Sequence, residues 1–98
     1  MRAARRLLNE CGSLLVYENA SPDGEDRDGW LERWDLQESG WIGLTPDEWR
    51  RMAAHVRTYD FPETVSDWRE LGREAGFRAV QELYVAPTNL FRLFAFRP

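Results

Sequence analysis

The segment LLNECGSLLVYENASPDGEDRDGW, Leu7 to Trp30, decides the fold that we expect. It reads as the end of a helix, a turn at Gly12, a strand over 13–18 and then a polar loop. The apolar run in this strand, LLVY, is typical of a strand covered on both faces, as in parallel sheets. A helix followed by such a strand is the second half of a βαβ unit. We therefore expect the preceding strand to lie outside this chain.

Three further helices are predicted between this strand and the C-terminal region. Residues 25–38 form the first, with Trp30 and Trp34 four positions apart on one side. The segment TPDE, which starts at Thr45, has the residues of a capping box with proline at the first helical position, and it opens the second. The third begins at Thr64 or Ser66 and stops at Gly76.

The C-terminal region predicts an antiparallel pair of strands. Residues 77–86 alternate and have one mostly polar side, which is typical of an edge strand. Residues 90–96 are apolar on both sides, so this strand should be central. The short turn between them implies antiparallel pairing. The expected fold is α/β, with a three-stranded mixed sheet of one parallel-type strand plus a hairpin, and about four helices.

Composition limits the classes of function. The chain has 98 residues, which allows one domain at most, and 17 acidic against 13 basic residues give a net charge of −4. The one basic cluster, formed by Arg2, Arg5 and Arg6, is interpreted as the solvated side of a helix rather than a nucleic-acid surface. A single cysteine favours a reducing compartment, and the sequence contains no secretory signal or membrane-length apolar run, so we expect a cytoplasmic protein.

The elements together resemble the C-terminal portion of class I S-adenosylmethionine-dependent methyltransferases, in particular the small-molecule enzymes with extra helices after the fifth strand. The resemblance rests on LLNECGSLLVYEN, on LTPDEWRRMAAHV with DFPETVSDWRELGREAGF, and on GFRAVQELYVAPTNLFRLFAF. It implies a Rossmann-like sheet whose last strand is antiparallel and inserted beside the fifth. It divides the chain, as a single partial domain, into a helix and core strand (1–18), inserted lid helices (19–62) and the last helix with the closing hairpin (63–98).

The resemblance also implies what this chain lacks. Members of the family bind S-adenosylmethionine through a Gly-rich loop after the first strand, and no such spacing of glycines occurs here. We therefore expect the cofactor only in the complete enzyme and no cofactor-binding residue in this chain. On its own the chain should be inactive, and its catalytic residues stay unassigned.

Candidate substrate-binding residues follow from the carboxyl end of the predicted strand, where ligands of open α/β sheets bind. Glu18 and Asn19 are placed there, and Glu18 either holds a hydroxyl or amine of the acceptor or ends the strand in solvent. Arg27, Trp30 and Trp34 belong to the expected lid, although tryptophans at helical spacing also suit a core. His55 is either a general base or a packing residue.

One histidine and one cysteine do not supply the ligands of a zinc site, so no metal is expected. The alternative to a methyltransferase segment is a non-catalytic protein-interaction module, because a parallel-type strand without its neighbour exposes an edge that recruits other chains. The expected partner is a separately made N-terminal half or a second copy of the chain. A small-molecule acceptor joins the complete enzyme, and neither nucleic acid nor membrane is expected.

Overall fold

The chain folds as α/β with a four-stranded mixed sheet, in a computed structural model that describes residues 1–41 and 43–98. The strand order is β2-β1-β4-β3. Along the chain the elements are α1 (Arg2–Leu7), β1 (Leu14–Ser21), α2 (Arg27–Asp35), the short 3-10 helix η1 (Glu38–Gly40), α3 (Pro46–Tyr59), β2 (Glu63–Thr64), α4 (Val65–Glu74), β3 (Ala79–Val85) and β4 (Phe91–Arg97).

The C-terminal hairpin forms as predicted. β4 is central, and it pairs antiparallel with β1 on one side and with β3 on the other. β3 is an edge strand, and a bulge between Glu82 and Tyr84 shifts its register against β4. Since β1 and β3 both run opposite to β4, they are parallel to each other and separated by it.

The prediction of three strands is wrong because β2 adds a fourth. β2 pairs parallel with the end of β1 over two residue pairs, Ala20 with Glu63 and Ser21 with Thr64. A two-residue strand is too short to show alternation, so no sequence pattern marks it. Along Leu14 to Asn19, the edge of β1 that faces away from β4 has no partner strand in the described part of the chain.

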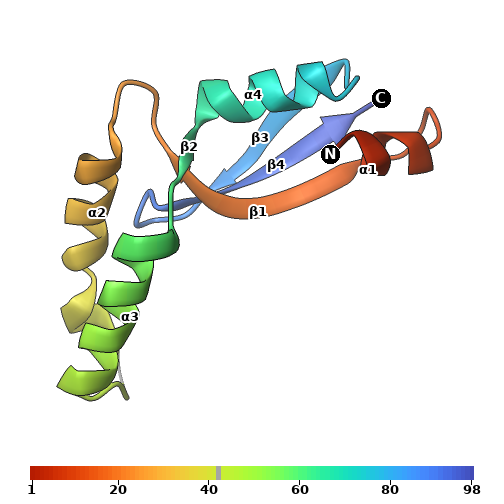
Figure 1. Cartoon of the computed structure of the whole chain (residues 1–98). Coiled ribbons are helices and arrows are strands. Elements are labelled where there is room, and N and C mark those ends of the chain that lie inside the picture. The colour runs from red at the N-terminus through yellow and green to blue at the C-terminus, as the bar shows by residue number, and fades with distance from the viewer. Residues whose placement is uncertain (42) are drawn as a thin grey trace.

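The prediction that β1 is covered on both faces is also wrong. Leu14 and Val16 contribute to a buried cluster beneath α4, whereas Leu15 is 60% and Tyr17 55% exposed. Figure 1 shows α4 lying along one side of the sheet. Burial on both faces requires helices on both faces, and none of the described helices covers the side that carries Leu15 and Tyr17.

Local signals at the helix ends are confirmed. Thr45 and Glu48 form the predicted capping box of α3, and Thr64 forms another with Asp67 at the start of α4. Gly76 follows α4 with a φ of +98°, a conformation that glycine adopts without strain. Among the described residues, no helix combines the length and the apolar character that crossing a bilayer requires.

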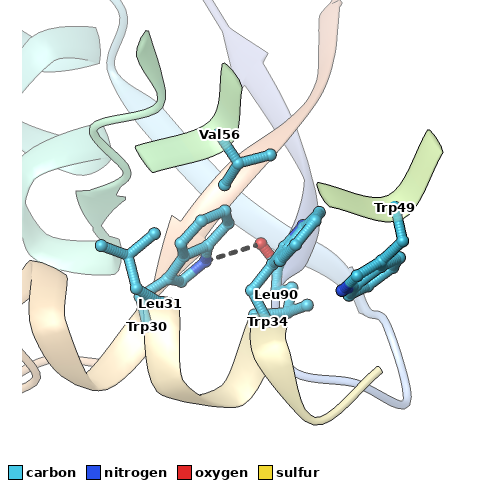
Figure 2. Packing of buried hydrophobic residues seen from close by; sticks show 6 residues of the cluster. All are labelled: Trp30, Leu31, Trp34, Trp49, Val56 and Leu90. Atoms are coloured by element: carbon cyan, nitrogen blue, oxygen red, sulfur yellow. Dashed lines mark hydrogen bonds between the residues drawn. The ribbon is translucent and has the colours of Figure 1, made fainter. Parts of the chain in front are cut away.

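Two hydrophobic clusters divide the molecule. In the helical lobe, α2 and α3 enclose a cluster of Trp30, Leu31, Trp34, Trp49, Val56 and Leu90 (Figure 2). In the sheet lobe, α4 and the sheet enclose Ala20, Ala75, Phe77, Phe94 and Phe96. The lobes meet where Leu90 of the turn between β3 and β4, and Phe91 at the start of β4, pack with the helical cluster. Figure 1 shows α2 and α3 extending away from that end of the sheet.

Candidate functional site

The carboxyl end of β1 lies further along the chain than the sequence indicated. β1 continues to Ser21, and its last two residues, Ala20 and Ser21, are 0% and 2% exposed. Glu18 and Asn19 therefore lie within the strand and not in the loop beyond it. The loop that follows the strand begins at Pro22, which cannot donate a backbone hydrogen bond to the sheet.

Glu18 and Asn19 point to opposite faces because successive side chains alternate along a strand. Glu18 is exposed and lies opposite Arg92 in β4. Asn19 lies opposite Phe91, and its backbone carbonyl accepts a hydrogen bond from the indole N–H of Trp68 at 3.4 Å. The structure therefore does not bring these two predicted site residues together in one pocket.

Arg92 organises this end of the sheet, although the sequence reasoning did not identify it. It is 6% exposed, and one of its amino groups donates to the carbonyl of Ala20 at 3.1 Å. The other donates to the side-chain oxygen of Asn89 in the hairpin turn, and Nε lies 3.5 Å from a carboxylate oxygen of Glu82. One cation thus connects β1, β3 and the turn. Its signal in the sequence was a single arginine within the apolar run LFRLFAF.

Three acidic side chains of the loop after β1 form hydrogen bonds or ion pairs with other parts of the chain. The carboxylate of Asp23 accepts hydrogen bonds from the backbone N–H of Ser66 at 2.8 Å and from its hydroxyl at 2.7 Å. These bonds lower the pKa of Asp23 because they favour its charged form. Glu25 pairs with Arg33, and Asp26 caps α2 by accepting from the N–H of Gly29 at 2.9 Å.

Arg27 joins the start of α2 to the end of α3. Its Nε donates to the carbonyl of Asp60 at 2.9 Å, and a terminal nitrogen donates to the carbonyl of Arg57 at the end of α3. Its guanidinium also lies over the ring of Phe61, 4.1 Å from the centroid. Since cations near helix C-termini and over aromatic faces are stabilising, these contacts fix α2 against α3.

Trp30 and Trp34 come together, but inside the helical lobe. Trp30 is 0% exposed and its indole N–H donates to the carbonyl of Leu90 at 3.2 Å (Figure 2). Trp34 stacks on Trp49 with ring centroids 4.6 Å apart. Both indoles therefore pack in the core, whereas the lid hypothesis placed them on an open aromatic wall.

His55 lies on the exposed side of α3, where its ring is 4.8 Å from that of Tyr59. No hydrogen bond or ion pair joins it to Glu18 or Asn19 among the described residues. Two hollows on this part of the chain are open to solvent. One is lined by Asp47, Arg50, Arg51 and Ala54 of α3, and the other, between α2 and α3, by Asp28, Leu31, Glu32, Asp35 and Arg57.

The described residues also contain no group of three or more histidine, cysteine, aspartate or glutamate side chains that could hold a metal ion. The carboxylates of Asp23, Glu25 and Asp26 after β1 are bound to Ser66, Arg33 and the start of α2. Comparison with protein-family models, with curated proteins and with solved structures finds no match for this chain.

Proposed function

We propose that this chain is the C-terminal segment of an S-adenosylmethionine-dependent methyltransferase and forms the acceptor side and lid of its active site. The observation that carries this proposal is the position of β4, which lies antiparallel between the mutually parallel strands β1 and β3. This is the closing arrangement that the sequence resemblance implies, with α4 as the helix before β3. In this order β4 separates the two parallel strands β1 and β3.

The lid of this proposal is a fixed wall and not a hinged flap. Trp30 and Arg33 attach α2 to the hairpin turn through the carbonyls of Leu90, Thr88 and Asn89, and Arg27 attaches it to the end of α3. A wall held at both ends excludes water and orients an acceptor without a closing motion. In this reading, Glu18, Asn19 and His55 are the candidate acceptor contacts, and Trp30, Trp34 and Arg27 support the wall from inside.

The cofactor-binding half lies outside this chain in the proposal. S-adenosylmethionine supplies the methyl group when it is bound there. The residues described here shape the acceptor side of the site and position the acceptor. Proximity and orientation are a large part of what an enzyme adds to such a reaction.

The test is a cofactor titration. We expect the DNA flanking this gene to encode a strand followed by a Gly-rich loop, either in frame or in a neighbouring gene. Calorimetry should detect micromolar binding of S-adenosylmethionine by that polypeptide assembled with this chain, and none by this chain alone. Micromolar binding by the isolated chain would place the cofactor site here and refute the division into halves. Flanking DNA without such a loop, or an assembly that does not bind the cofactor, would refute the methyltransferase reading itself.

A second candidate function is a non-catalytic interaction module. It is favoured by a specific observation, the edge of β1 that has no partner strand along Leu14 to Asn19 in the described residues. This reading requires no cofactor and no acceptor. It requires a protein partner whose surface suits that edge.

A further inference from the structure

The open edge of β1 presents backbone groups outward. The N–H of Ala20 donates to the carbonyl of Leu90 across from β4. In an antiparallel ladder, alternate residues face the partner strand, so Ala20, Glu18 and Val16 direct their backbone groups to β4. Leu15 and Tyr17 then direct their N–H and C=O groups away from β4, towards the open edge.

The same two residues carry large side chains that are exposed to solvent. Leu15 is 60% and Tyr17 55% exposed, and both lie on the face of the sheet opposite α4. The ring of Tyr17 lies beside that of Phe91, with centroids 5.8 Å apart. An edge strand with free backbone groups and exposed apolar side chains is a site where another strand pairs.

The other edge of the sheet is protected against such pairing. β3 contains a bulge between Glu82 and Tyr84, which interrupts a regular ladder and increases local twist. The charged side chain of Glu82 lies at this bulge, 3.5 Å from Arg92. Bulges and charges are common means by which natural sheets block their edges. The register between β1 and β4 shows no bulge, so β1 lacks this protection.

Charge distinguishes the two ends of the open edge. Arg2, Arg5 and Arg6 lie in α1, before β1 begins, and one acidic residue, Glu10, follows them and pairs with Arg5, so this end keeps a net positive charge. At its other end lie Glu18 and Glu63, and burial together with the carboxylate of Asp67 raises the pKa of Glu63. Two copies that meet antiparallel along this edge place the basic end of each beside the acidic end of the other, whereas a parallel meeting places like charges together.

We propose that the edge of β1 from Leu14 to Asn19 pairs antiparallel with the same edge of a second copy of this chain, about a two-fold axis near Val16, so that Leu15 lies opposite Tyr17 of the other copy and the edge of Ala20 stays with β2. The sheet then continues through both copies, and the outward N–H and C=O groups of Leu15 and Tyr17 gain partners. A two-fold contact of this kind uses the same patch on both molecules and closes on itself, so it gives a dimer and not a filament.

This dimer does not depend on the methyltransferase reading. A cofactor-binding half that adds a strand beside β1 would compete with the second copy for the same edge. In an alternative dimer, the sheet faces opposite α4 would pack against each other instead of the edges. That dimer would involve Tyr84, which is 50% exposed on the edge strand β3, as much as it involves Tyr17.

Sedimentation velocity of the isolated chain over a range of concentrations tests the proposal, and S-adenosylmethionine is left out so that the result is independent of the cofactor titration. We expect a monomer–dimer equilibrium. The variant Leu15→Pro should remain monomeric, because proline removes an outward N–H that the monomer does not use. Tyr17→Lys should raise the dimer dissociation constant about tenfold by placing two like charges near the axis. The matched control Tyr84→Lys should leave it within about twofold.

Far-ultraviolet circular dichroism of each variant establishes that it folds, and the tyrosine pair decides the result if Leu15→Pro does not fold. A wild-type chain that stays monomeric at every concentration overturns the proposal. Equal weakening by Tyr17→Lys and Tyr84→Lys also overturns it, because that result indicates face-to-face packing. A dimer that resists Tyr17→Lys shows that another surface is used.

Discussion

Two buried side chains near the junction of the lobes, Trp30 and Arg92, each donate one hydrogen bond to a backbone carbonyl. Trp30 binds the carbonyl of Leu90 and Arg92 binds that of Ala20. A buried carbonyl that loses its donor keeps the full penalty of its lost hydration. Each of these bonds therefore adds to what its residue contributes through packing.

Replacing Trp30 by phenylalanine tests this point. Trp30→Phe keeps an aromatic ring in the cluster but removes the indole donor to the carbonyl of Leu90, which then keeps only the N–H of Ala20. We therefore expect a loss of about 0.5–1.5 kcal/mol in the free energy of unfolding, the net value of one hydrogen bond. Trp41→Phe is the matched control, because Trp41 is 48% exposed and the same loss of ring area there removes little burial. Urea denaturation measures both. Equal effects of the two substitutions would show that the hydrogen bond is unimportant.

At the scale of elements, α4 rests directly on the sheet through a glycine. A methyl group at Gly72 would lie 2.6 Å from a methyl carbon of Val80 and 2.7 Å from ring carbons of Phe96. Such distances are well inside normal van der Waals contact. Leu71, the neighbour of Gly72 in the helix, is 40% exposed, so the close contact with the sheet belongs to the glycine.

The substitution Gly72→Ala sets two effects against each other. Alanine favours a helix interior over glycine by about 0.5–1 kcal/mol. Overpacking against Val80 and Phe96 costs about 1–3 kcal/mol, so we expect net destabilisation. Gly40→Ala is the control, because nothing lies within 4 Å of the added methyl group there. If urea denaturation finds Gly72→Ala more stable than the wild type, α4 moves away from the sheet more easily than this packing implies.

Elements that depend on neighbouring residues could be predicted from the sequence, and those that depend on distant ones could not. The capping box of Thr45 and Glu48 joins residues three positions apart, so its pattern is complete in the sequence. The hairpin likewise needs only a short turn between two apolar segments. The burial of β1 depends instead on which helices cover each face, and the apolar run LLVY does not specify that.

The candidate site shows the same limit. The sequence predicts Glu18 and Asn19 at the carboxyl end of a strand that in fact continues to Ser21, because polar residues can remain in a strand whose neighbours are fixed by pairing. Arg92 was not identified because its contacts with Ala20 and Glu82 come from the two strands on either side of β4 and form only when the sheet is assembled. Its contact with Asn89 in the turn is local but does not by itself mark the arginine as buried. Roles that arise from such convergence are visible only in the folded chain.

At the scale of the whole molecule, the chain is more extended than its length suggests. Its radius of gyration is 15.7 Å, against about 13 Å for a compact domain of about 100 residues. The two lobes have separate hydrophobic clusters and meet through the hairpin turn. Each cluster is small, and little buried area couples them, so the lobes should not unfold as one cooperative unit.

We therefore expect the helical lobe to open before the sheet lobe. Trp30, Trp34, Trp41 and Trp49 lie in or beside the helical lobe, so in a Trp68→Phe background tryptophan fluorescence reports that lobe alone. Hydrogen exchange of the β4 amides reports the sheet lobe, since this central strand is paired on both sides. Because two-state unfolding requires coincident transitions, fluorescence should change at a lower urea concentration than the loss of β4 protection. Coincident transitions would mean that Leu90 and Arg92 couple the lobes strongly enough to make the chain a single unit.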